Sequence, residues 1–80
     1  MHELRLVREV FEDILRRAEE EGMQKVTRVY LRVGGFTEID PEILRHFFAE
    51  CARGTILEGA EVTVEESPAR ELRLLGFEGE

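Results

Sequence analysis

The spacing of apolar residues changes from a helical to a strand period along this chain, and this change limits the folds that it can adopt. Between residues 4 and 18, apolar side chains recur at steps of three and four, with arginine and glutamate on the other faces. This period predicts an amphipathic helix that begins at Leu4 and ends near Gly22. Its apolar face consists of Leu4, Val7, Phe11, Ile14, Leu15 and Ala18.

Residues 26–33 alternate with a period of two and are rich in β-branched and aromatic residues. This pattern predicts a strand that ends at Gly34-Gly35. We expect Val29, Leu31 and Val33 to face the same core as the first helix.

A second helix is indicated by Asp40, whose side chain can act as its N-cap. Pro41 suits the first helical position, and Ile39 is placed to pack on Leu44. Because Gly54 is a natural stop, we expect the helix to run to about Arg53. Its buried face would consist of Ile43, Leu44, Phe47, Phe48 and Cys51.

Two further strands are predicted at residues 60–65 and 71–77, with a turn at 67–70 between them. The Leu74-Leu75 pair breaks the alternation and suggests a bulge. The order is then α-β-α-β-β: an α/β (α+β) fold with two helices on one face of a three-stranded sheet. We expect residues 1–80 to form a single domain.

Composition excludes several classes of function. The 80 residues carry a formal net charge of -7, which opposes binding to nucleic acid and to anionic membranes. No apolar stretch approaches the roughly 20 residues that span a bilayer, and no signal peptide pattern is present. We therefore expect a cytoplasmic protein. The sequence also has no catalytic triad order, phosphate loop or supported carboxylate pair, so we do not expect an enzyme.

The first three residues, Met1-His2-Glu3, have the donors of a metal site. The α-amine of Met1, the backbone nitrogen of His2 and the His2 imidazole Nδ1 can close chelate rings around one ion. Ni(II) and Cu(II) favour such a planar nitrogen set, whereas Zn(II) has no such preference. The alternative is that a histidine stands at this position by chance or is the remnant of an expression tag.

Other residues with potential chemistry have simpler explanations. We expect His46 to be a solvated surface residue and Asp40 to be a helix cap. The single cysteine, Cys51, is expected to be a core thiol, because a reactive thiol needs an electropositive, partly exposed setting. Glu19, Glu20 and Glu21 would form a solvated helix end.

The opening Met1-His2-Glu3, the strand at 25–34, the helix start at 40–42 and the run Glu58-Gly59-Ala60-Glu61 together resemble the HypA family. Its members are nickel metallochaperones for the maturation of nickel-iron hydrogenase and, in some organisms, of urease. The resemblance implies Ni(II) binding at Met1, His2 and Glu3, where Glu3 would act through its backbone nitrogen, with help from its carboxylate. It also implies a HypB-type GTPase and a hydrogenase large-subunit precursor as partners.

One departure from the family is large. Family members carry a zinc subdomain with two Cys-x-x-Cys pairs between the second and third strands, and this sequence has none near 67–71. We therefore expect Ni(II) but no zinc. An alternative function is a small interaction or assembly domain that has kept the fold without full nickel transfer. The sequence leaves open whether the subdomain was lost naturally or by design, and whether the chain forms a homodimer.

Overall fold

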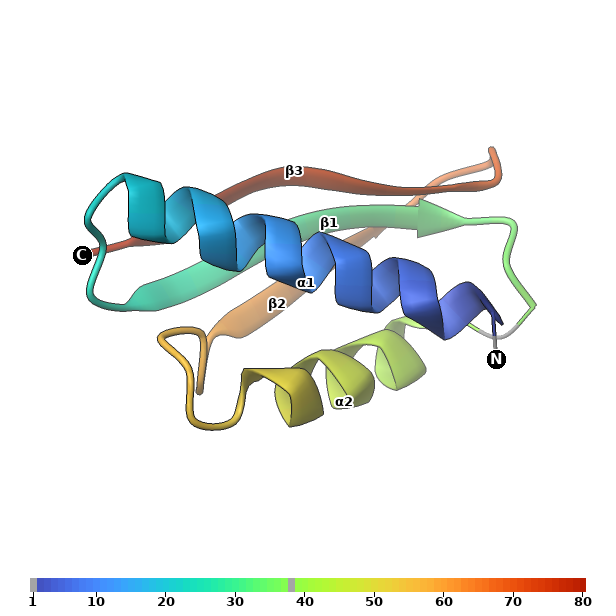
Figure 1. Ribbon diagram of the computed structural model, residues 1–80. Helices are drawn as coiled ribbons and strands as arrows, with labels where there is room; N and C mark the ends of the chain where they lie inside the picture. The colour runs from blue at the N-terminus through green and yellow to red at the C-terminus, as the bar shows by residue number, and fades with distance from the viewer. Residues whose placement is uncertain (1, 38) are drawn as a thin grey trace.

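The computed structural model describes residues 2–37 and 39–80, with only the backbone of His2 (Figure 1). The elements are helix α1 (His2–Glu20), strand β1 (Val26–Gly34), helix α2 (Pro41–Ala52), strand β2 (Glu61–Glu66) and strand β3 (Glu71–Gly79). This order confirms the predicted α-β-α-β-β arrangement. The first helix starts at His2, earlier than the expected Leu4, so His2 and Glu3 belong to its first turn.

The sheet has the order β2-β1-β3, with β1 in the centre. Strand β1 pairs parallel to β2 and antiparallel to β3. Residues 67–70 therefore do not close a hairpin between neighbouring strands. They form a short crossover that passes the end of β1 and joins the two edge strands.

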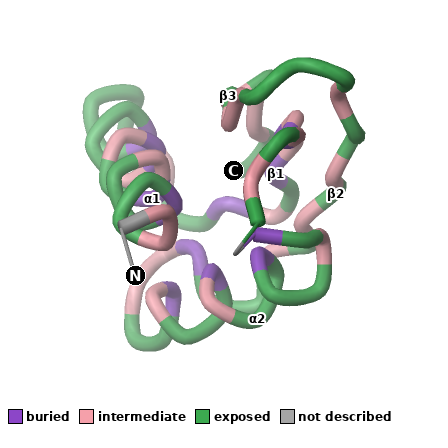
Figure 2. Tube along the Cα trace, turned by 90° about the vertical axis from the view of Figure 1, so that its right-hand side faces the viewer, coloured by how far each residue is buried: buried purple, intermediate pink, exposed green. Residues whose placement is uncertain are grey.

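Both helices cover one face of this sheet (Figure 2). Phe11 of α1 and Phe48 of α2 meet edge to face, with ring centroids 5.4 Å apart. Val29, Leu31 and Val33 are buried, as predicted. The full buried core consists of Val7, Phe11, Ile14, Ala18, Val26, Val29, Leu31, Val33, Ile39, Leu44, Phe48, Ala52 and Leu57.

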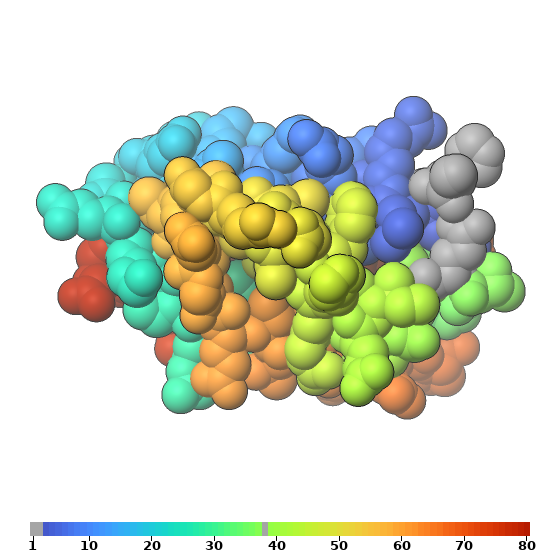
Figure 3. Space-filling view, turned by 90° about the horizontal axis from the view of Figure 1, so that it is seen from below, coloured from blue at the N-terminus to red at the C-terminus, as the bar shows by residue number. Residues whose placement is uncertain are grey.

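The predicted start of α2 is confirmed. An Asp40 carboxylate oxygen accepts a hydrogen bond from the backbone nitrogen of Ile43 at 2.8 Å. The predicted buried face is wrong at one residue, because Ile43 is 42% exposed. The fully buried residues are Leu44, Phe48 and Ala52, four apart, and Ile43 lies outside this stripe. The molecule is seen from the side of α2 in Figure 3.

Strand β3 contains the predicted bulge. Tyr30 pairs with Gly76 and Leu31 pairs with Leu74, so Leu75 has no partner on β1. This extra residue is turned toward solvent and is 43% exposed.

Charged pairs cover the strands. Arg28 and Arg32 of β1 form ion pairs with Glu61 and Glu65 of β2. A side-chain hydrogen bond with Tyr30, together with the charge of Glu61, raises the pKa of Arg28 above its usual value. The two arginines of β1 thus neutralise two glutamates of the adjacent strand β2.

Among the described residues, no helix is long and apolar enough to span a bilayer.

Candidate metal site at the start of the first helix

The structure places part of the predicted metal site. Met1 and the His2 side chain lie outside the described residues. The backbone of His2 begins α1, and Glu3 follows in the same turn. The Glu3 side chain is only 17% exposed, although it carries a charged group.

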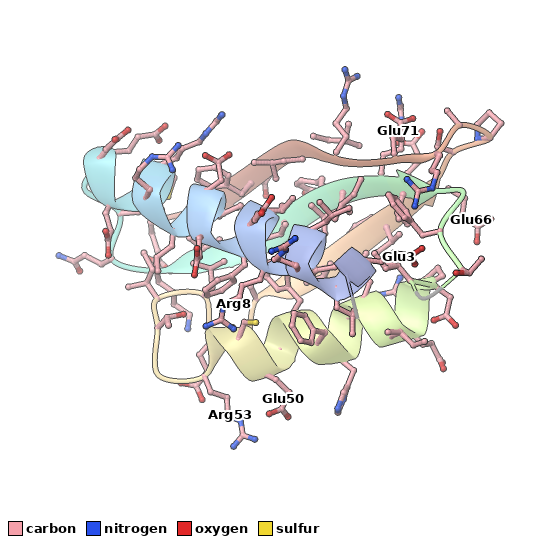
Figure 4. The ribbon with its side chains drawn as sticks, turned by 45° about the vertical axis from the view of Figure 1, so that its right-hand side comes forward. Glu3, Arg8, Glu50, Arg53, Glu66 and Glu71 are labelled. Atoms are coloured by element: carbon pink, nitrogen blue, oxygen red, sulfur yellow. The ribbon has the colours of Figure 1, made fainter. Side chains whose placement is uncertain are left out.

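Among the residues that hold the Glu3 carboxylate, Arg70 and Thr37 come from distant parts of the chain. Arg70 Nη2 lies 3.6 Å from Glu3 Oε2. The hydroxyl of Thr37 donates a hydrogen bond to the same oxygen at 3.4 Å. The start of α1, the segment after β1 and the crossover therefore meet at one point. Figure 4 shows Glu3 at the end of the molecule where Glu66 ends β2 and Glu71 begins β3.

Two glycines allow the crossover to lie against the end of β1. A Cβ atom at Gly34 would overlap the Ser67 carbonyl oxygen, and one at Gly35 would lie 2.6 Å from the Arg70 Cα. Gly35 also has a φ of +74°, which favours glycine. The backbone nitrogen of Ser67 donates to the Val33 carbonyl at 2.9 Å. The sequence Gly34-Gly35 thus fixes where Arg70 lies.

The Arg70 side chain is further held by an aromatic ring. Its guanidinium carbon is 4.5 Å from the centroid of the Phe36 ring, which is cation-π geometry. Arg70 itself is 65% exposed. The stacking therefore orients an otherwise solvated side chain toward Glu3.

The local backbone suits a nitrogen-rich metal site. In the first turn of a helix, the N–H groups have no acceptor within the helix. The backbone nitrogens of His2 and Glu3 can therefore lose their protons to a metal without breaking the hydrogen-bond ladder of α1. The positive end of the helix dipole slightly disfavours a cation but eases the ionisation of these amides. The donor set of Met1-His2-Glu3 accordingly fits Ni(II).

The other candidate residues do not join this site. His46 is exposed on α2, as expected, and Asp40 is engaged as the helix cap. Cys51 is only partly buried and packs against the core. Over residues 2–37 and 39–80, no group of three or more histidine, cysteine or acidic side chains could hold a metal.

Sequence reasoning missed Phe36, Thr37 and Arg70. The only relevant signals were Gly34-Gly35 and the turn at 67–70, which predicted local bends. Neither signal indicates that the bend at 34–35 and the turn at 67–70 are in contact. Helix α2 and strand β2 separate them in the sequence, so their contact depends on how these elements pack.

Comparison with known proteins places this arrangement in context. A family model described as "Hydrogenase/urease nickel incorporation, metallochaperone, hypA" matches residues 1–72. The hydrogenase maturation factor HypA of Chlorobaculum tepidum is 40% identical over 70 residues, covering 88% of this chain and 62% of that protein. The Archaeoglobus fulgidus protein of the same name is 40% identical over 72 residues, with 88% and 66% covered.

The chain thus spans roughly three-fifths of the length of the curated relatives that it matches. The solution structure of the Ni metallochaperone HypA from Helicobacter pylori has the same fold, with a TM-score of 0.75 and 13% sequence identity. That alignment covers 92% of this chain and 93% of the other. The family description names a metallochaperone rather than an enzyme. From the family match and the 40% identity, this chain belongs to the HypA family.

Proposed function

We propose that this chain binds one Ni(II) ion at Met1-His2-Glu3 and carries it toward the maturation of a nickel enzyme. Four nitrogens would hold the ion: the α-amine of Met1, the backbone nitrogens of His2 and Glu3, and the His2 imidazole. The observation that supports this proposal best is the position of Glu3. Its backbone nitrogen lies in the first helical turn, while its carboxylate is engaged by Arg70 and Thr37.

The type of donor favours Ni(II) and Cu(II) over Zn(II). Deprotonated amides and imidazole form a strong, flat nitrogen field, which suits Ni(II) and Cu(II) and gives Zn(II) no particular benefit. The match to the nickel incorporation family begins at residue 1 and therefore includes all three residues. Both observations support nickel as the cargo.

The client would be a nickel-iron hydrogenase precursor, since the relatives are named hydrogenase maturation factors. The family description also names urease. A HypB-type GTPase would be the partner in this transfer, and both proteins would be met in the cytoplasm. The ion is cargo in this scheme, so the site must release it as well as bind it.

The test is a nickel titration of untagged protein that starts at Met1. We expect a stoichiometry near one and a yellow, diamagnetic complex, because square-planar Ni(II) has paired electrons. His2→Ala should abolish binding, and so should acetylation of the Met1 α-amine, because each removes a donor of the chelate. His46→Ala is the matched control and should bind as the parent does.

The same titration has a pH dependence that follows from the donors. Affinity should fall below about pH 6 to 7, because the amine, with a reference pKa near 8, and the imidazole, near 6.5, must lose protons to bind. If a blocked amino terminus binds nickel as tightly as the free one, Met1-His2-Glu3 is not the site. The interaction or assembly domain would then be the better description of this chain.

A further inference from the structure

Arg70 has a position that the nickel proposal alone does not explain. It is a solvated residue of the crossover, yet three features place it against Glu3. Its backbone rests on Gly35, its guanidinium stacks on Phe36, and its Nη2 lies 3.6 Å from the Glu3 carboxylate. The Arg70 side chain is 65% exposed and that of Glu3 only 17%, so a solvated cation is directed onto a largely covered carboxylate.

We propose that Arg70 is a positioning residue that selects the coordination geometry of the metal site by holding the Glu3 carboxylate away from the ion. This inference rests on the nickel function proposed above. Glu3 offers two kinds of donor, a backbone nitrogen and a carboxylate. The nitrogen supports a planar site, whereas carboxylate oxygen suits ions such as Mg²⁺, Ca²⁺ and Mn²⁺ and can also bind Zn²⁺.

The contacts show how this selection works. Arg70 and Thr37 both engage the same oxygen, Oε2 of Glu3. The stack on Phe36 limits the directions in which the guanidinium can point. While these contacts persist, Glu3 presents its nitrogen to the ion. Without Arg70, the negative carboxylate would lose this positive neighbour and would be drawn toward a nearby dication as an additional oxygen ligand.

A matched control is available on the neighbouring strand. Arg73 is exposed on β3, where it pairs in register with Arg32. Replacement of Arg73 by methionine makes the same change in charge and size as Arg70→Met. It does so three residues away from the Glu3 contact, so it separates the specific contact from the general loss of a positive charge.

The experiment compares the parent, Arg70→Met, Arg70→Lys and Arg73→Met, all with a free amino terminus. The readouts are the electronic spectrum and magnetic moment of the nickel complex, and the ratio of nickel to zinc affinity from competition. For Arg70→Met we expect a partly six-coordinate, paramagnetic nickel complex. We also expect the ratio of nickel affinity to zinc affinity to fall about tenfold. This is the range typical when a residue that holds a metal ligand in place is removed. Arg70→Lys should be intermediate, and Arg73→Met should match the parent.

The outcomes separate the two proposals. If the parent does not bind nickel, the proposed function is wrong and this inference falls with it. If the parent binds and Arg70→Met gives the same spectrum and affinity ratio as Arg73→Met, only the role of Arg70 is wrong. A merely structural role would lower nickel and zinc affinity together and leave the bound complex planar. Arg70→Lys keeps the charge and provides the same test should Arg70→Met fail to fold.

Discussion

Two adjacent glycines at the end of β1 bring the parts of the candidate site together. Gly34 lets the crossover backbone approach where any side chain would overlap it, and Gly35 adds a backbone conformation that other residues rarely adopt. Their role is steric: an added Cβ would meet the backbone of Ser67 and Ala69 at Gly34, and the Cα and first side-chain carbons of Arg70 at Gly35. Backbone contacts cannot be relieved by turning a side chain, so even one methyl group should be costly here.

We therefore expect Gly34→Ala to destabilise the protein by about 1 to 3 kcal/mol, the usual cost of overpacking. Gly76→Ala is the matched control within β3. It has no heavy atom within 4 Å of the added Cβ and no positive φ. It should change stability by no more than about 0.5 kcal/mol, as expected for a substitution away from special features. Urea unfolding measures both, and equal effects would show that the close approach at Gly34 is not important.

Helix α1 links the site to the rest of the molecule. Its inner face is part of the core, through Val7, Phe11 and Ile14 among others, and its first turn carries His2 and Glu3. The outer face is charged and exposed, including Arg5 and Arg8. A carrier must bring its ion to the receiving site, so the partner has to approach the surface beside His2. That surface includes the outer face of α1.

We expect Arg5→Glu or Arg8→Glu to weaken association with a HypB-type GTPase, because charged rims tune encounter rate and selectivity. The fold should be unaffected, since the pair that Arg8 (labelled in Figure 4) forms with Glu12 at 3.5 Å is exposed. Arg32→Glu on the central strand is the comparison and should matter less. Association rates at two salt concentrations provide the measurement. Disruption by the strand variant alone would contradict docking through α1.

At the scale of the whole molecule, the crossover joins the two edge strands at the end that carries Glu3. Residue 80 lies at the opposite end (Figure 1), where the Glu80 carbonyl accepts hydrogen bonds from the backbone nitrogens of Gln24 and Lys25, and the Glu80 nitrogen donates to the Lys25 carbonyl. The family's zinc subdomain would be inserted near 67–71. In its place is a four-residue connection between β2 and β3, and the backbone nitrogen of its first residue, Ser67, donates a hydrogen bond to the Val33 carbonyl of β1. Both helices and all three strands contribute side chains to one hydrophobic cluster, and we therefore expect residues 1–80 to fold as a single domain.

We accordingly expect the protein to fold without structural zinc. A structural zinc site usually has four ligands from cysteine, histidine or carboxylate, and the sequence has one cysteine and two histidines far apart. Purified protein treated with a strong chelator should keep its thermal midpoint and its cooperative unfolding. Stoichiometric zinc whose removal unfolds the chain would contradict this expectation.

Local sequence by itself determined the elements. The three- and four-residue spacing of α1, the alternation in β1 and the Asp40-Pro41 helix start all act over a few residues, through hydrogen bonds and periodic burial that need no distant partner. The bulge at Leu75 follows from the same alternation. The prediction that Ile43 is buried was wrong, because hydrophobicity alone does not define the width of the buried stripe of a helix. The width is set by which residues pack against the core, here Leu44 and Phe48.

The tertiary structure alone decided the strand order and the surroundings of Glu3. A short turn between two strands usually makes a hairpin, yet β2 and β3 lie on opposite sides of β1. The pairing of Glu3 with Arg70 depends on this order, because only the crossover past Gly34-Gly35 brings Arg70 to the start of α1. Motif residues such as Met1-His2-Glu3 can be recognised from local sequence. The residues that orient them come from chain segments that meet only when the sheet and its helices have packed.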